Sequence, residues 1–278
     1  MIAAENLTKT YGDVTAVDGI SFSVPAGEAF GLLGPNGAGK STTMKMIGGV
    51  SQRTSGSLTI MGLDPEQHGP EVRAHLGVVP QQDNLDEELK VRDNLLVYGR
   101  YFGLPMSYLR PKADELLEFA QLTDKAKSKV DALSGGMKRR LTIARSLINE
   151  PRILLLDEPT LTTHYMDEAE QLCDRLIVVD KGRIMAEGSP ASLIRNYSTR
   201  EVLELRFGSE RNASVGAELE GIGERLETLP DRVLIYTQDG EAALEEVSAR
   251  GLRPLTSLVR RSSLEDVFLR LTGRSLVD

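Results

Sequence analysis

Nine consecutive residues have the types and the spacing needed to hold a phosphate group. They fit the pattern G-x-x-x-x-G-K-[ST] and are Gly34, Pro35, Asn36, Gly37, Ala38, Gly39, Lys40, Ser41 and Thr42. Glycines let consecutive backbone N–H groups converge on phosphate oxygens at the positive end of a helix. In this pattern Lys40 reaches the β- and γ-phosphates, and the Ser41 hydroxyl binds Mg²⁺. The residues therefore predict a nucleotide-binding loop, in preference to a glycine-rich turn that has no ligand.

Such a loop must be positioned by a strand before it and a helix after it. Residues 29–33 are a short apolar run, typical of a buried strand, and residues 41–47 have helical composition. The strand, glycine turn and helix start that this pattern requires are therefore all predicted here.

Two residues elsewhere are candidates for contacts with the nucleotide. Tyr11 lies about two dozen residues before the loop and could stack on adenine, although a surface tyrosine packed on a hairpin is the alternative. Gln81 follows the strand-like residues 76–79 and a proline, so its amide could project from a strand end towards the metal and the γ-phosphate.

A second anion site is predicted at Ser134, Gly135 and Gly136, which precede a helical run at residues 137–148. A hydroxyl, free N–H groups and a helix N-terminus are together suited to an anion. The alternative is a plain helix N-cap. We interpret the basic run at residues 138–140 as a solvated face.

A buried-strand run at residues 152–156 ends in Asp157 and Glu158. Such a strand could deliver Asp157 to hold Mg²⁺ through water and Glu158 to polarise an attacking water molecule. His164 follows six positions later, and the other histidines lie too far away in sequence to suggest a zinc cluster.

The composition sets further limits. A net charge of −8 argues against a nucleic-acid partner bound through its phosphates. The single cysteine, Cys173, excludes a disulfide framework. No apolar run reaches the ~18 residues of a membrane span, so we expect any membrane role to depend on another subunit.

In their order, these motifs resemble an ATP-binding cassette ATPase, the nucleotide-binding subunit of an ABC transporter. The similar segments are the phosphate loop, the glutamine of the Q-loop (Gln81), the signature at Leu133–Leu141, the Walker B strand at Ile153–Pro159 and the switch histidine (His164). They cover roughly the first 195 residues. Residues 77–85 and 94–103 are similar to a narrower branch, which holds the daunorubicin-resistance and nodulation-factor (lipo-oligosaccharide) exporter ATPases.

The resemblance implies an α/β fold. It consists of a P-loop NTPase (RecA-like) core in residues 1–195, an N-terminal antiparallel sheet and a helical subdomain at about 83–148. It implies ATP and Mg²⁺ as cofactors, with Lys40, Gln81, Glu158 and His164 catalytic and Ser41, Gln81 and Asp157 at the metal. It also implies a head-to-tail homodimer or heterodimer, in which Ser134, Gly135 and Gly136 touch the ATP of the other copy. The dimer would drive an ABC-2-type membrane permease at the cytoplasmic face of the membrane, exporting a drug, lipid or oligosaccharide.

The chain departs from this family after Thr160. Five residues separate Glu158 from His164, whereas a parallel crossover needs a dozen or more. A helix and a strand of the family therefore have no residues here. We expect the strands on either side either to pair directly or to carry unpaired backbone groups. The alternative function is a cassette that binds ATP but is defective in hydrolysis.

Residues 196–278 predict a small accessory α+β domain without catalytic residues. Strands are expected near 202–207, 233–237 and 253–259, and helices at 241–250 and 264–271. Ser262 and Glu265 predict a capping box for the last helix.

Overall fold

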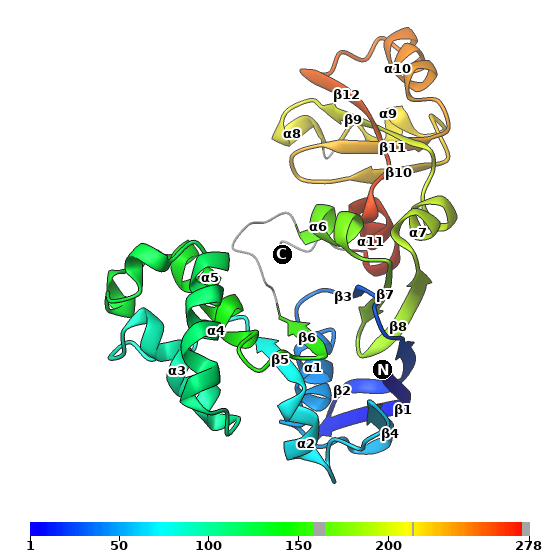
Figure 1. Cartoon of the computed structure of the whole chain (residues 1–278). Coiled ribbons are helices and arrows are strands. Elements are labelled where there is room, and N and C mark those ends of the chain that lie inside the picture. The colour runs from blue at the N-terminus through cyan, green and yellow to red at the C-terminus, as the bar shows by residue number, and fades with distance from the viewer. Residues whose placement is uncertain (158–164, 213, 274–278) are drawn as a thin grey trace. The chain divides into compact units, whose positions relative to one another are not determined.

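The computed structural model describes residues 1–157, 165–212 and 214–273 (Figure 1). The chain forms two compact units, and each is described by itself. One contains residues 1–27, 37–165 and 181–183, and the other contains residues 28–36, 166–180 and 184–278.

The first unit begins with an antiparallel sheet of strand order β2-β1-β4. Its strands are β1 (Ile2–Tyr11), β2 (Val14–Val24) and β4 (Ser55–Ile60). Gly12 turns the hairpin between β1 and β2 with a φ of 56°. The helices α1 (Lys40–Ile47) and α2 (Gly69–Ala74) lie on either side of β4 in the chain. The predicted N-terminal antiparallel sheet is confirmed.

Three helices in the same unit enclose a hydrophobic core of their own. They are α3 (Val91–Tyr101), α4 (Met106–Phe119) and α5 (Gly135–Ser146), with 3₁₀ turns at Thr123–Lys125 and Val130–Ala132. Leu95, Leu109 and Leu141 are fully buried between them.

Two parallel strands complete the first unit. The strands β5 (Leu76–Val79) and β6 (Ile153–Leu156) pair in register from Leu76 with Ile153 to Val79 with Leu156. The run at 152–156 forms the predicted strand but is not buried throughout, because Leu154 is 41% and Leu156 is 42% exposed. In the described residues β6 has only β5 as a neighbour, and the two exposed leucines lie on one face of this pair, opposite the buried Leu155.

The second unit holds a separate sheet of order β3-β7-β8. Its strands are β3 (Phe30–Leu33), β7 (Arg175–Asp180) and β8 (Arg183–Gly188). The strand β3 is half-buried rather than buried. The strands β3 and β6 belong to different units, so their direct pairing, one of two expected outcomes, stays a prediction.

The helices α6 (Tyr165–Leu172), α7 (Pro190–Tyr197) and α11 (Leu264–Thr272) share one core with this sheet. Leu176, Leu193 and Phe268 come from three different elements and are buried in this core. The last helix of the chain therefore packs on elements that follow the nucleotide motifs directly.

The C-terminal sheet is antiparallel, with strand order β10-β11-β9-β12. Its strands are β9 (Glu201–Arg206), β10 (Arg225–Thr228), β11 (Val233–Thr237) and β12 (Thr256–Arg261), and the helices α8 (Ser209–Asn212), α9 (Gly216–Leu219) and α10 (Gly240–Ala249) accompany it. The predicted α+β character is confirmed. The strand expected at 253–259 starts later, at Thr256.

The predicted capping box is wrong by one residue. Ser263 caps α11, and the box is closed by Asp266, whose Oδ2 accepts from the Ser263 N–H at 2.8 Å. Ser262 instead accepts a hydrogen bond from the Ser198 hydroxyl at 3.0 Å. Asp266 is 1% exposed and bonded to Arg260, so its position fixes where the helix begins.

Candidate nucleotide-binding site

The phosphate loop is packed against neighbouring backbone at Gly39. This residue has a φ of 103°, and a Cβ on it would lie 2.4 Å from the Ala16 carbonyl oxygen of β2. The Ala38 carbonyl accepts from the Gly182 N–H at 3.1 Å, and the Gly182 carbonyl accepts from the Asp18 N–H at 2.9 Å. Both the left-handed backbone and the lack of space therefore require glycine at position 39.

The start of α1 suits an anionic ligand. Gly39 is its N-cap, no side chain caps the helix, and its first turn has no acidic residue. Thr43 turns inward and donates from its hydroxyl to the Gly39 carbonyl at 3.0 Å. Lys40, Ser41 and Thr42 are half-buried. The first N–H groups of α1 thus point to a site where phosphate would satisfy them.

The other loop residues differ in exposure. Gly34, Pro35 and Ala38 are buried, while Asn36 and Gly37 are exposed. Gly37 has a φ of 80° and no neighbour around the place of a Cβ in the described part of the chain. Glycine is required there by backbone conformation alone.

Gln81 and Asp157 both lie just beyond the carboxyl ends of paired strands. The Asp157 N–H donates to the Val79 carbonyl at 2.9 Å and so extends the ladder between β5 and β6 by one bond. Gln81 is exposed, two residues after Val79. Because neighbouring parallel strands end at the same edge, the sequence of β5 and β6 places an amide and a carboxylate there.

The interpretation of residues 138–140 as a solvated basic face is wrong for the middle residue. Arg139 is 5% exposed and donates to the carbonyl oxygens of Pro80 and Asp157, at 3.3 Å for the latter. It therefore ties α5 to the backbone beside Gln81 and to the end of β6. Lys138 pairs with Glu87 at 3.2 Å on the surface.

The predicted second anion site lies at the start of α5. Ser134 is the N-cap, and its Oγ accepts from the Met137 N–H at 3.4 Å, so the plain-cap interpretation also describes it. Gly135 and Gly136 are exposed, and neither has positive φ. Within the described residues nothing lies within 4 Å of a Cβ built on either glycine. Nothing in the described part of the chain accounts for their lack of a side chain.

Tyr11 ends β1 and is 48% exposed. Its hydroxyl lies 3.2 Å from the Ser51 Oγ, and the Lys9 ammonium lies 4.7 Å from its ring centroid. The Lys9 contact and the bond to Ser51 match the surface-packing alternative, and adenine stacking stays a prediction.

Glu158 and His164 lie outside the described residues. In the described ranges 1–157, 165–212 and 214–273, no group of three or more His, Cys, Asp or Glu residues could hold a metal ion. Ser41 and Asp157 nevertheless offer the hard oxygen donors that Mg²⁺ prefers. No described helix is long and apolar enough to cross a membrane.

Two family profiles match the chain. Residues 17–161 match "ABC transporter", and residues 212–273 match "Nodulation factor export protein NodI, C-terminal domain". The chain is 42% identical to the Nod factor export ATP-binding protein I of Ralstonia nicotianae, over 100% of this chain and 95% of that protein. It is 45% identical to the protein of the same name from a Rhizobium species, over 96% and 95%.

Solved structures are similar as well. An ATP-binding subunit of an ABC transporter matches with a TM-score of 0.65 and 26% identity, over 71% of this chain and 93% of that chain. The cassette MJ0796, in a dimeric post-hydrolysis state bound to ADP and phosphate, matches with a TM-score of 0.62 and 28% identity, over 68% and 98%. The predicted P-loop NTPase fold is thereby confirmed.

The lengths of the alignments bear on the short spacing after Thr160. The match to the Ralstonia protein extends over 308 residues, although this chain has 278. The relative therefore has residues without a counterpart here. The difference between the two lengths is large enough for a parallel crossover with its helix.

Proposed function

Because this chain belongs to the ABC transporter family and is its ATP-binding subunit, we propose that it powers the export of a lipo-oligosaccharide of the Nod factor type. Its full-length relatives carry that activity in their names. A separate ABC-2-type permease would form the path across the membrane, and this chain would act at the cytoplasmic face. ATP hydrolysis is the activity of the family.

We further propose that two copies of the cassette pair head to tail and enclose two ATP molecules between them. This proposal rests mainly on Gly135 and Gly136, which are exposed at the start of α5 and lack any neighbour that requires glycine in the described chain. A ligand approaching from outside gives them a reason, since its phosphate must come close to the backbone. The phosphate loop of one copy and the Ser134 cap of the other would then enclose the ATP. A solved relative is itself a dimer.

The roles of the remaining residues follow the motifs. The loop from Gly34 to Thr42 would bind the phosphates through its backbone and Lys40. Ser41, Gln81 and Asp157 would hold Mg²⁺, which neutralises charge on the phosphates when bound. Glu158 would orient the attacking water and His164 would contact the γ-phosphate.

Two substitutions test the dimeric site. Lys40→Ala should remove most ATP affinity, measured with a fluorescent ATP analogue. Ser134→Arg should leave analogue binding by the monomer unchanged and should abolish ATP-dependent dimerisation in analytical ultracentrifugation. If Ser134→Arg also abolished binding by the isolated monomer, the assignment of Ser134 to the second copy would be wrong.

A second candidate function is a cassette that binds ATP without hydrolysing it at the family's rate. Its support is that only five residues separate Glu158 from His164 and that β6 exposes two leucines. Single-turnover hydrolysis by the purified chain separates the two functions, with Glu158→Gln as the matched control. Rapid hydrolysis that Glu158→Gln abolishes would eliminate the defective cassette.

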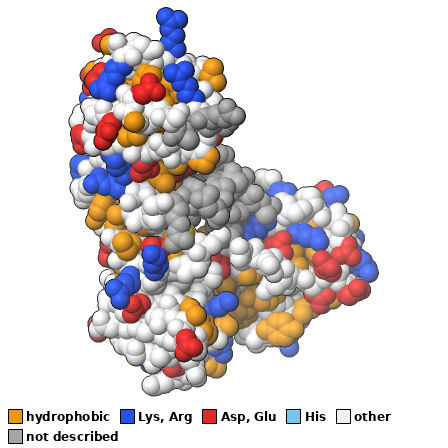
Figure 2. Space-filling model, turned by 180° about the vertical axis from the view of Figure 1, so that it is seen from behind, with side chains coloured by type: hydrophobic (Ala, Val, Ile, Leu, Met, Phe, Trp, Pro, Cys, Tyr) orange, Lys and Arg blue, Asp and Glu red, His pale blue; other side chains and the backbone are white. Residues whose placement is uncertain are grey.

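A partner protein is supported by exposed hydrophobic side chains in the helical region of α3 to α5. Tyr101 is 81% and Phe119 is 66% exposed, and hydrophobic side chains are visible on this region in Figure 2. Aromatic side chains are enriched where proteins bind one another, so these two are candidates for contact with a partner. Co-purification with the permease from detergent-solubilised membranes should succeed for the wild-type chain and weaken for Tyr101→Ser with Phe119→Ser, while ATP binding is retained. Unchanged recovery of the double variant would separate this surface from the permease.

A further inference from the structure

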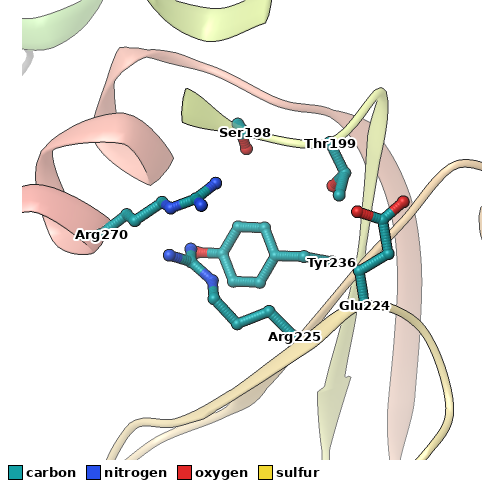
Figure 3. A pocket seen from close by; sticks show the side chains of 6 residues that line it. All are labelled: Ser198, Thr199, Glu224, Arg225, Tyr236 and Arg270. Atoms are coloured by element: carbon teal, nitrogen blue, oxygen red, sulfur yellow. The ribbon is translucent and has the colours of Figure 1, made fainter. Parts of the chain in front are cut away.

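The C-terminal part of the second unit contains a polar cavity of about 180 Å³. It is lined by Ser198, Thr199, Glu224, Arg225, Tyr236 and Arg270 (Figure 3). These residues come from the segment after α7, from β10 with the residue before it, from β11, and from α11. We call this cavity the two-arginine pocket. None of the nucleotide motifs contributes to it.

Two guanidinium groups are directed towards the same part of the pocket. Figure 3 shows the ends of Arg225 and Arg270 near the hydroxyl end of the Tyr236 ring, while Thr199 and Glu224 lie towards its other end. The Tyr236 side chain is 1% exposed and forms the floor. Its hydroxyl donates to Asp266 at 3.2 Å, so the ring is fixed in place.

Arg225 is held in position while its hydrogen-bonding capacity is not fully used. Its guanidinium carbon lies 3.8 Å from the Tyr236 ring centroid, which fixes the plane of the group. The Nη2 atom is buried and makes no hydrogen bond, although the Glu227 carboxylate lies 3.1 Å away. Burial raises the pKa of Glu227, against the effect of the nearby Arg225.

Arg270 lies on α11 and is exposed. One of its nitrogens donates to the Tyr197 carbonyl at 2.8 Å. No carboxylate pairs with Arg270 in the described ranges of the chain. The acid Asp266 of α11 is already engaged, because it accepts a hydrogen bond of 2.7 Å from Arg260. The acid facing the pocket itself is the exposed Glu224, which accepts from Gln238 at 2.7 Å.

We propose that the two-arginine pocket binds a phosphate group between Arg225 and Arg270. Planar guanidinium groups match the oxygens of phosphate and bind them in pairs. The volume is below that of ordinary drug-sized sites, so the ligand is smaller than a nucleotide. Inorganic phosphate and a small phosphorylated sugar share this chemistry, and in the second case the hydroxyl groups would face Thr199 and Glu224.

Calorimetric titration of the full chain at constant ionic strength tests the proposal, with inorganic phosphate and ribose 5-phosphate as probes. Arg270→Gln should weaken binding of both by about tenfold or more, because a charged hydrogen-bond partner is lost. Glu224→Gln should strengthen binding severalfold, because it removes a like charge at the rim. Arg253→Gln serves as the matched control, since Arg253 is an exposed arginine outside the pocket.

Lys40→Ala separates this pocket from the phosphate loop: the saturable binding that Arg270→Gln weakens should persist in the Lys40→Ala variant. If ribose 5-phosphate binds at least tenfold more tightly than inorganic phosphate, the ligand is a sugar phosphate. Equal affinities assign the pocket to inorganic phosphate. The proposal is overturned if neither probe binds saturably, if Arg253→Gln costs as much as Arg270→Gln, or if Lys40→Ala abolishes binding while Arg270→Gln does not. If Arg270→Gln does not fold, the affinity of Glu224→Gln for the two probes still tests the proposal.

Discussion

Replacing Arg139 by methionine should show that one buried cation holds three segments of the nucleotide-binding unit together. Its guanidinium donates to the carbonyl oxygens of Pro80 and Asp157, and it lies 3.8 Å from the Asp83 carboxylate. Methionine keeps most of the buried hydrocarbon and removes the donors. Each hydrogen bond to a charged group contributes about 1.5–3 kcal/mol.

The expected cost is smaller than the sum of two such bonds. Pro80 and Asp157 are half-buried, so water can replace part of the lost interaction, and burying the guanidinium has a cost of its own. We therefore expect a loss of about 2–3 kcal/mol. With a urea dependence of about 2 kcal/mol per molar, the unfolding midpoint should fall by roughly 1 M.

Urea unfolding followed by circular dichroism measures this shift, and Arg140→Met is the matched control. Arg140 makes a single bond at the surface, to the Gln121 side chain at 3.1 Å, so its loss should stay below about 0.5 kcal/mol. ATP turnover should fall for Arg139→Met and not for Arg140→Met, because Arg139 positions the backbone beside Gln81. Equal midpoints for the two variants would refute this reasoning.

Two glycine substitutions should impair the use of ATP for different reasons. Gly39→Ala should lower affinity for an ATP analogue by at least about tenfold, because the left-handed backbone costs about 1–2 kcal/mol and the new Cβ would overlap the Ala16 carbonyl; near wild-type affinity in a fluorescence titration would contradict this. Gly136→Ala should leave the fold intact and raise its stability by up to about 1 kcal/mol through helix propensity, yet ATP turnover should fall if a second copy places its nucleotide there. Turnover equal to wild type would argue against that contact.

The local elements were predictable because their signals are local. The apolar run before the phosphate loop and the helix after it were confirmed, and the strands at 76–79 and 233–237 have the expected bounds. Each of the three strands is a short apolar or β-branched run bounded by glycine, proline or polar residues, and no distant residue is needed to decide its conformation.

The role of Arg139 could not be predicted in this way. Lys138, Arg139 and Arg140 have the same charge and lie next to one another, so composition does not distinguish them. Which of them faces inward depends on the rotation of α5, and this is set by the burial of Leu141 and Ala144 in the helical core.

The register of the last capping box failed for a related reason. Two serines and two acids stand side by side at 262–263 and 265–266, and either pair has the spacing of a box. Long-range contacts decide which pair forms the box, since Asp266 is bonded to Arg260 and accepts a hydrogen bond from Tyr236.

The exposed leucines of β6 lead to a last prediction about the residues missing after Thr160. Leu154 and Leu156 have the composition of a strand with neighbours on both sides, yet each is about two-fifths exposed. Inserting the corresponding crossover residues of the Ralstonia relative after Thr160 should cover them. Covering two-fifths of two leucines contributes about 2 kcal/mol, so the urea midpoint should rise by roughly 1 M. A glycine- and serine-rich insertion of equal length is the control, because a flexible loop changes stability little. If both insertions had the same effect, the exposure of these leucines would not result from a missing strand.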